Sequence, residues 1–293
     1  MNRRIFIVLL VLLLIGVGFL RLGRHRLVKH TFVLMDTYVD FVVDNGHGGI
    51  VGLLAKRGRD LEKKLSFFSP NSCVSKLNER KNISAEDECF PILADLINIS
   101  QKVWQETDGA FDPGFRGDVP ISNVQVDGKG IIVPSGGRFD FSGIAKGYIV
   151  DKLIRLARER GVDFIMVNAG GDVGVWDKKG VGVWVEVKDP QAGSLDRVRI
   201  VRGAVATSGN YYRGGHIIDP RTKRVVSGLI SASAQDGSCA VSDAWATALF
   251  VLGRKGLSLA ENSGVGAIVG LIGESGKIVA MKNNRWQKFL DKK

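Results

Sequence analysis

The sequence predicts the α+β class: a single mixed α/β domain behind an N-terminal transmembrane signal-anchor helix. Residues 5–20 form an uncharged, mostly aliphatic run, and amphipathic helical segments then alternate with strand-like runs. No repeat or linker divides that remainder. Of the 293 residues, 45% are hydrophobic, which excludes a disordered chain and allows a large core. We therefore predict an anchor and basic juxtamembrane stretch over 1–30 and one domain over 31–293.

The first element is the predicted anchor. Arg3 and Arg4 precede the apolar run, no A-x-A cleavage pattern follows it, and no cysteine follows it closely enough for lipoprotein processing. A helix of that length reaches about 24 Å, so flanking arginines would have to compensate for a core of roughly 30 Å. An uncleaved signal anchor is the favoured interpretation. A cleaved signal peptide and a buried core helix are the alternatives.

The following elements are read from hydrophobic periodicity and turn residues. Helices are expected over residues 50–66, 72–77, 91–107, 147–160 and 242–252. Strands are expected over residues 31–43, 164–168, 182–187 and 197–202, and a terminal hairpin over 266–272 and 277–281. The glycine-rich residues 45–49 read as a turn.

The positive charge of the chain lies at its two ends. The net charge is +11, but residues 1–30 hold six basic residues and no acidic one, and residues 277–293 hold six basic residues and one acidic one. The body between them is neutral. Basic runs beside an apolar segment are typical of contact with membrane headgroups, whereas a DNA-binding domain usually carries its charge on the body. We therefore expect a membrane partner and no nucleic acid.

Glycine-rich segments beside apolar runs indicate a phosphate-bearing ligand. Gly143 and Lys146 stand just before the predicted helix over 147–160, where backbone N–H groups and an ammonium could face one phosphate. A solvated lysine at a helix start is the alternative. The chain continues as a strand after Gly170-Gly171, so this glycine pair lacks the helix that a dinucleotide-binding fingerprint requires.

Candidate metal and proton-transfer residues follow. Asp243 and Thr247 are four residues apart on one predicted helix face and form a hard-oxygen pair suited to Mg²⁺; a carboxylate that complements the helix dipole is the alternative. His216 is the candidate general base by its ordinary pKa, with Asp219 next, although a structural histidine is the alternative. The three cysteines are too few for a disulfide scaffold and form no C-x-x-C pair, so a zinc site is not expected.

Taken in order, these segments resemble the FAD:protein FMN transferases, the ApbE-type flavin transferases. The resemblance runs from about Val33 to Ile278. Its motifs are M-D-T from Met35, S-F-F-S-P-N-S from Ser66 with L-N at Leu77, G-A-F-D-P from Gly109, D-F-S-G-I-A-K-G-Y from Asp140, N-A-G-G-D from Asn168, T-S-G-N-Y from Thr207, H-I-I-D-P from His216 and S-D-A-W-A-T from Ser242. Each motif alone is weak, whereas their shared order is specific.

The resemblance implies a site by position. The FAD site would be lined by Met35, Phe68, Ala110, Phe111, Asp112, Asp140 and Lys146, with His216 and Ile217 toward the flavin and pyrophosphate. The carbonyl of Gly143, with Asp243 and Thr247, would bind Mg²⁺, and His216, Asp219 and Lys146 would be catalytic. The chain departs from the family pattern at Gly114-Phe115-Arg116-Gly117-Asp118, so we expect the flavin-side wall to be shortened or rebuilt there.

The implied activity is Mg²⁺-dependent transfer of FMN from FAD to a threonine hydroxyl of an acceptor flavoprotein, with release of AMP. An FAD pyrophosphatase that gives FMN and AMP, and a membrane-tethered flavin-binding protein without turnover, are the alternatives. The family's usual acceptors imply a single-pass protein of the cell inner membrane whose catalytic domain is periplasmic or extracytoplasmic. The basic residues after the apolar run favour the opposite orientation.

Overall fold

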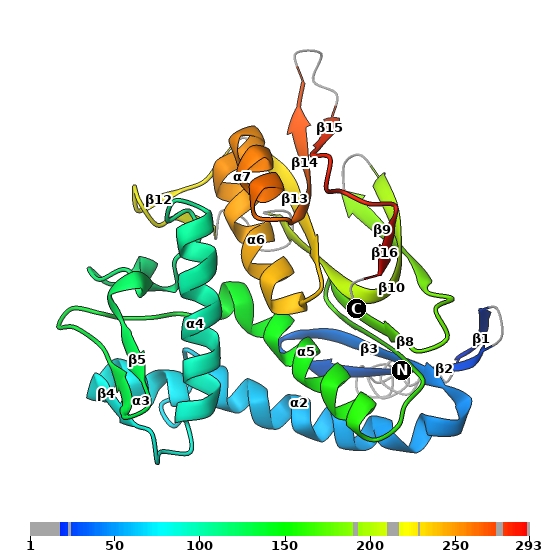
Figure 1. The fold of residues 1–293 in the computed structure, drawn as a ribbon, viewed down its shortest axis with the longest axis horizontal. Helices are drawn as coiled ribbons and strands as arrows, with labels where there is room; N and C mark the ends of the chain where they lie inside the picture. The colour runs from blue at the N-terminus through cyan, green and yellow to red at the C-terminus, as the bar shows by residue number, and fades with distance from the viewer. Residues whose placement is uncertain are drawn as a thin grey trace, which may run out of the picture.

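A computed structural model describes residues 18–22, 25–189, 193–209, 217–227, 229–273 and 278–291. A mixed sheet runs through the molecule, with helices packed over one face (Figure 1). Eleven strands of the described ranges form this sheet, nine of them in the order β1-β2-β3-β7-β8-β10-β13-β14-β15, while β9 and β16 pair with β10. Most neighbouring strands are antiparallel, and β16 pairs with β10 in parallel.

The sheet strands have the following bounds: β1 (Gly18–Leu22), β2 (His25–Leu34), β3 (Thr37–Asp44), β7 (Phe164–Ala169), β8 (Asp172–Asp177), β9 (Val183–Asp189), β10 (Gly193–Gly209), β13 (Leu229–Asp236), β14 (Gly266–Ile272), β15 (Ile278–Lys282) and β16 (Phe289–Asp291). A second sheet joins β4 (Asn82–Ser84), β6 (Gly130–Ile132) and β5 (Gln125–Asp127), and β11 (Ile218–Asp219) pairs with β12 (Arg224–Val225). The expected strands over 164–168, 182–187 and 197–202 and the terminal hairpin are confirmed.

The helices are α2 (Val51–Leu65), α3 (Cys73–Arg80), α4 (Phe90–Glu106), α5 (Ser142–Glu159), α6 (Cys239–Leu252) and α7 (Gly256–Asn262), with short 3-10 turns η1 (Asn45–Ile50), η2 (Pro113–Arg116), η3 (Ile121–Asn123) and η4 (Gly253–Lys255). Helices α5 and α6 pack on each other and on the sheet. Figure 1 shows α3, α4, β4 and β5 together at the end of the molecule opposite β9. This arrangement is an α+β fold, as predicted.

Helix α6 is the centre of the core. Trp245 and Phe250 on this helix are fully buried, as are Phe139 and Phe141 on the segment that leads into α5. The Trp245 indole N–H donates to Glu106 at 3.3 Å, so the polar edge of the ring is satisfied as well. A helix that is apolar on nearly every side has to lie between other layers, which explains why α6 is enclosed by α4, α5 and the sheet.

Glycine at position 147 lets the two central helices approach closely. A Cβ at Gly147 would lie 2.3 Å from the carbonyl oxygen of Cys239 and 2.8 Å from Cβ of Asp243. Neither contact is possible for a side chain. The small residue on α5 therefore fixes how near the polar residues of α6 come to those of α5.

Two expected elements near the start of the domain differ from those observed. The strand expected over 31–43 is a hairpin of β2 and β3, turning at Met35 and Asp36, which both have positive φ (55° and 54°). Two such residues form the primed turn that suits a twisted hairpin, but without Asn-Gly the turn gives no strong sequence signal. The turn expected over 45–49 is the 3-10 turn η1.

The two central helices begin earlier than expected. Helix α5 begins at Ser142, whose N–H donates to the Asp140 carboxylate at 3.0 Å, so Gly143 lies in its first turn and Lys146 one turn inside. Helix α6 begins at Cys239 rather than Ser242, because Asp151 of α5 accepts the N–H groups of Cys239 and Ala240 at 2.8 and 3.0 Å. The Ser238 hydroxyl also caps the helix by accepting the Val241 N–H at 3.3 Å, a local signal that the expected start at Ser242 missed.

The expected anchor lies mostly outside the described residues. Its last three residues, Gly18 to Leu20, belong to β1, which pairs with β2, so the expected helix does not extend through Leu20. Among the residues that the structure describes, no helix is long and apolar enough to cross a membrane.

Candidate functional site

The candidate site is built where α5 crosses α6. The backbone N–H of Gly147 donates to Oδ2 of the buried Asp243 at 3.0 Å. In a regular helix this N–H would donate to the carbonyl four residues earlier, which belongs to Gly143. A carbonyl oxygen has two lone pairs, so the Gly143 carbonyl can accept a further partner.

The three residues expected at the metal lie together at this crossing. A Cβ placed on Gly143 would be 3.4 Å from Oγ1 of Thr247, and that hydroxyl lies 3.3 Å from Oγ of Ser208 on β10. Asp243 stands one turn before Thr247 on α6. A carboxylate, a hydroxyl and a carbonyl are oxygen donors of the kind Mg²⁺ takes, so these residues fit the expected ion. Within the described ranges, no three His, Cys, Asp or Glu side chains gather as a metal-binding group.

Lys146 is held beside this oxygen set by Asp172 of β8. The two side chains form an ion pair, and the Asp172 carboxylate is buried. Burial alone would lower the pKa of Lys146, but the carboxylates of Asp172 and Asp243 outweigh it and raise that pKa. Lys146 therefore stays an ammonium and can compensate the charge of an anion at this point.

Asp172 is a residue of the candidate site to which the sequence analysis assigned no role. Burial raises its pKa to about 7, with Asp243 adding to the shift and Lys146 opposing it. Its Oδ1 has no hydrogen-bond partner among the described residues, although the Thr207 backbone amide favours the charged form. The only sequence signal was its place at the end of N-A-G-G-D. The turn before it packs on the strand after Met35, since a Cβ at Gly170 would lie 2.7 Å from the Thr37 hydroxyl.

The segment with Ala110, Phe111 and Asp112 lines the same region. The Phe111 ring would lie 3.4 Å from a Cβ on Gly143, and the Asp140 N–H donates to the Pro113 carbonyl at 2.8 Å. The Asp112 carboxylate accepts the N–H groups of Gly114 and Ile121 at 2.7 and 3.1 Å. Burial raises its pKa against these hydrogen bonds. Asp112 therefore holds the loop between Asp112 and Ile121 in place through hydrogen bonds to its backbone.

Asp140 is engaged by the segment in which the chain departs from the family pattern. Its Oδ2 accepts a hydrogen bond of 2.7 Å from Nε of Arg116 in η2. The Arg116 guanidinium lies 5.1 Å from the centre of the Phe67 ring, which packs edge-on against Phe68 at 5.4 Å. Phe68 itself is 84% exposed. The rebuilt wall thus contains an arginine and aromatic rings, and Arg116 is a second residue that the motifs did not single out.

The candidate bases have different surroundings. His216 lies outside the described residues. Asp219 binds Arg221 through both carboxylate oxygens at 2.9 Å, and these hydrogen bonds lower its pKa, which makes it a weaker base. Ile217 is buried in the core, and Lys223 of the same hairpin donates to the carbonyls of Phe115 and Gly117 at 3.0 Å. The segment after His216 is therefore docked on the wall that contains Arg116.

The fold and this site define a mixed α+β domain with a hard-oxygen set at one helix crossing and, beside it, a lysine ammonium paired with a buried carboxylate. A model of the ApbE family matches residues 35–119 and 116–269, and the chain belongs to that family. It is 30% identical over 276 residues to a FAD:protein FMN transferase of Rhodobacter capsulatus, covering 80% of this chain and 52% of the relative. It is 25% identical over 264 residues to the FAD:protein FMN transferase of Escherichia coli strain K12, covering 70% of this chain and 74% of that relative.

Solved structures show the same fold. The flavin transferase ApbE from Vibrio cholerae superposes with a TM-score of 0.77 at 21% identity, covering 91% of this chain and all (100%) of the other. The ApbE protein from Thermotoga maritima superposes with a TM-score of 0.75 at 28% identity, covering 88% of this chain and 97% of the other. The chain spans about half the length of the R. capsulatus relative.

Proposed function

We propose that this protein transfers the FMN moiety of FAD to a threonine hydroxyl of an acceptor protein and releases AMP. The observation that carries the proposal is the gathering of Gly143, Asp243 and Thr247 beside the Lys146–Asp172 ion pair. FAD:protein FMN transferase is the name of relatives at 25–30% identity. The oxygen donors and the ammonium at this site support the same reaction for this chain.

The reaction breaks the pyrophosphate of FAD, so negative charge grows on the departing AMP. The Lys146 ammonium, paired with Asp172, would stabilise that charge. Gly143, Asp243 and Thr247 would hold Mg²⁺, which supplies Lewis-acid stabilisation of phosphate oxygens when bound. Asp172 keeps the lysine charged and oriented.

The acceptor threonine must lose a proton, and His216 is the proposed base. Asp219 is paired with Arg221, which supports His216 over Asp219 for this role. His216→Ala should slow transfer about 10²- to 10⁴-fold while FAD still binds. Transfer at the wild-type rate across the pH range would show that the acceptor or another group supplies the base.

A single incubation distinguishes transfer from hydrolysis. The protein is mixed with FAD, Mg²⁺ and a candidate acceptor domain, and the acceptor is examined by in-gel flavin fluorescence and mass spectrometry. An FMN adduct on a threonine supports transfer. Free FMN and AMP without an adduct would instead identify a pyrophosphatase, and intact bound FAD a flavin-binding protein without turnover. The Asp243→Ala variant, which lacks the site carboxylate, is the matched control.

We also propose that the protein is a single-pass protein of the inner membrane with its catalytic domain outside the cytoplasm. The apolar run over residues 5–20 and a disulfide bond between Cys73 and Cys89 support this, since disulfides persist in oxidising compartments. Alkaline phosphatase fused to the C-terminus should be active in a bacterial host. An inactive phosphatase fusion beside a fluorescent cytoplasmic reporter fusion would place the domain inside.

A further inference from the structure

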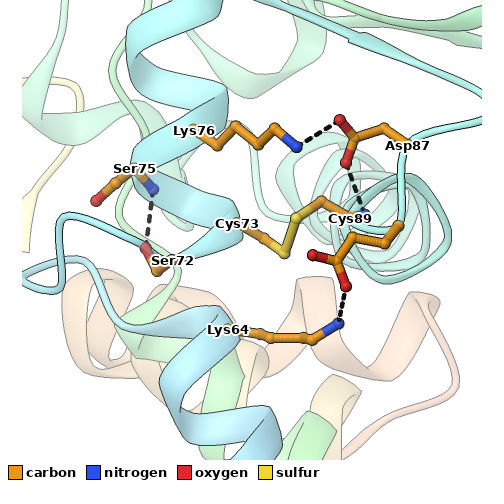
Figure 2. The surroundings of a disulfide bond; sticks show 8 residues. Lys64, Ser72, Cys73, Ser75, Lys76, Asp87 and Cys89 are labelled. Carbon is orange, nitrogen blue, oxygen red and sulfur yellow. Dashed lines mark hydrogen bonds and ion pairs between the residues drawn. A yellow bond between two sulfur atoms is a disulfide. The ribbon is translucent and has the colours of Figure 1, made fainter.

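A disulfide joins α3 to the start of α4. It lies close along the chain to Phe67 and Phe68, the aromatic residues of the rebuilt flavin-side wall. Cys73 opens α3 and Cys89 directly precedes α4, and their Cα atoms are 5.4 Å apart (Figure 2). Both residues are buried, with 2% and 4% of their surfaces exposed. Ion pairs lie on either side: Lys76 with Asp87 at 2.5 Å and Lys64 with Glu88 at 2.9 Å. The sequence did not predict this bond, since an odd number of cysteines gave no pairing.

Helix α3, which the disulfide fixes at its first residue, carries the loop with Phe68. Ser72 caps the helix by accepting the N–H of Ser75 at 2.9 Å (Figure 2). The Ser75 hydroxyl donates back to the Ser69 carbonyl at 2.7 Å. These bonds join the loop to the helix one residue from Phe68. The position of the loop therefore depends on the position of α3.

The other end of α3 holds the segment that contains Asp140. The Asn78 side-chain amide donates to the Phe139 carbonyl at 2.8 Å, and its oxygen accepts the Phe139 N–H at 2.7 Å. Lys81, just after the helix, donates to the Gly137 carbonyl at 2.7 Å. This two-point clamp acts on the residue next to Asp140. One short helix thus positions both Phe68 and Asp140, two of the residues expected at FAD.

We propose that Cys73 and Cys89 are an oxidative modification site whose disulfide locks α3 and thereby holds the FAD-binding wall, an inference that rests on the proposed function. An eight-residue helix has little intrinsic stability, so it needs an external constraint to present two ligand-contacting segments. The buried sulfurs lie away from solvent, so the bond is made before α3 and α4 close over it.

The oxidant is a protein disulfide that acts by thiol–disulfide exchange. The thiolate of one cysteine attacks a sulfur of that disulfide, which gives a mixed disulfide and releases one oxidant thiolate. The second cysteine thiolate then displaces the oxidant sulfur, so the Cys73–Cys89 bond forms. The oxidant leaves as a dithiol with the two electrons and, after protonation, the two protons.

The existence of the bond is tested on the full chain purified in detergent from a host that exports it. Iodoacetamide labels the denatured protein before and after reduction, and mass spectrometry counts the adducts. We expect one adduct before reduction, at Cys239, and three after it, matching the three cysteines. Three adducts before reduction would overturn the proposal.

The lock is tested with the Cys73→Ser/Cys89→Ser double variant. Its FAD affinity should fall about ten- to a hundredfold, because a misplaced wall contacts the ligand poorly. Its affinity for Mn²⁺, followed by electron paramagnetic resonance, should stay within about twofold because the metal residues lie on other elements. Equal FAD affinity, or loss of both affinities together, would overturn the lock.

Two further variants separate the lock from general destabilisation and from the function itself. Asn78→Ala keeps the disulfide but removes the clamp, and should also weaken FAD binding. Lys64→Ala removes the ion pair beside the disulfide, and should leave FAD affinity unchanged. Wild-type FAD affinity in Asn78→Ala would refute transmission through α3. Failure of the oxidised wild type to bind FAD would instead refute the proposed function, while the adduct count would still report the bond.

Discussion

At the residue scale, the Asp243 carboxylate has two roles: it binds the backbone of α5 and it is the proposed cation ligand. Asp243 accepts the Gly147 N–H with Oδ2, whereas Oδ1 accepts no hydrogen bond from the residues that the structure describes and is the proposed ligand of a cation. The sequence pattern S-D-A-W-A-T identified the residue, but could not distinguish a metal ligand from a carboxylate at a helix start. The early start of α6 weakens the second interpretation, because Asp243 then lies beyond the first turn.

Substitution of Asp243 separates its hydrogen bond to α5 from its proposed role as a cation ligand. Asp243→Asn keeps an oxygen that can accept the Gly147 N–H, so the helix crossing should persist while the charge is lost. Asp243→Ala loses both. We expect both variants to lose nearly all FMN transfer and to bind Mn²⁺ at least about tenfold more weakly, since a hard cation loses its carboxylate. Wild-type cation affinity in Asp243→Asn would contradict the metal assignment.

Asp172 gives a prediction about pH. The carboxylates of Asp172 and Asp243 raise the pKa of Lys146, so Asp172→Asn should lower that pKa. Because the lysine would then lose its proton at lower pH, the alkaline limb of the pH–rate profile should move to lower pH. The profile is measured in saturating Mg²⁺. An unshifted alkaline limb would show that Lys146 is not the group that limits the rate there.

At the element scale, the approach of α5 to α6 decides whether the site exists. Gly147→Ala would place a Cβ 2.3 Å from the Cys239 carbonyl, which a rigid backbone cannot accommodate. We expect a loss of stability of about 1–3 kcal/mol and a larger loss of cation binding, because the helices must move apart.

A glycine on an open helix face is the matched control. A Cβ at Gly52 in α2 would meet nothing within 4 Å. Gly52→Ala should therefore leave the site intact and raise the free energy of unfolding by about 0.5–1 kcal/mol. Thermal unfolding and Mn²⁺ titration of both variants are the measurements, and equal behaviour would contradict the close-packing explanation.

At the scale of the whole molecule, the N-terminal boundary matters. Strand β2 begins at His25 and pairs with β3, and Leu27 and Val28 are buried. A chain that lacks residues 1–17 should keep its thermal stability and its FAD affinity. A chain that lacks residues 1–30 also loses β1 and the first six residues of β2, and burial of two aliphatic side chains suggests a loss of roughly 3–6 kcal/mol. Denaturant unfolding compares the two chains, and equal stability would show that β1 and this part of β2 contribute little.

The sequence by itself determined the family, the α+β class, most of the helices and strands, and the residue types at the candidate metal site. These follow from periodicity, capping residues and ordered motifs, all of which are local signals. Ser72 as the cap of α3 and the strand after Gly171 are examples. The flavin-side departure at Arg116 was also visible as a break in the motif order.

Only the tertiary structure decided which of these residues meet. The pairing of Lys146 with Asp172 spans 26 residues, the bond from Gly147 to Asp243 spans 96, and the Asn78 clamp spans 61. The Cys73–Cys89 bond and the bonds from Asp151 to the start of α6 depend on partners from other elements in the same way. Sequence periodicity carries no information about such contacts. They are set by packing across the core, whereas periodicity reports only on residues that are neighbours along the chain.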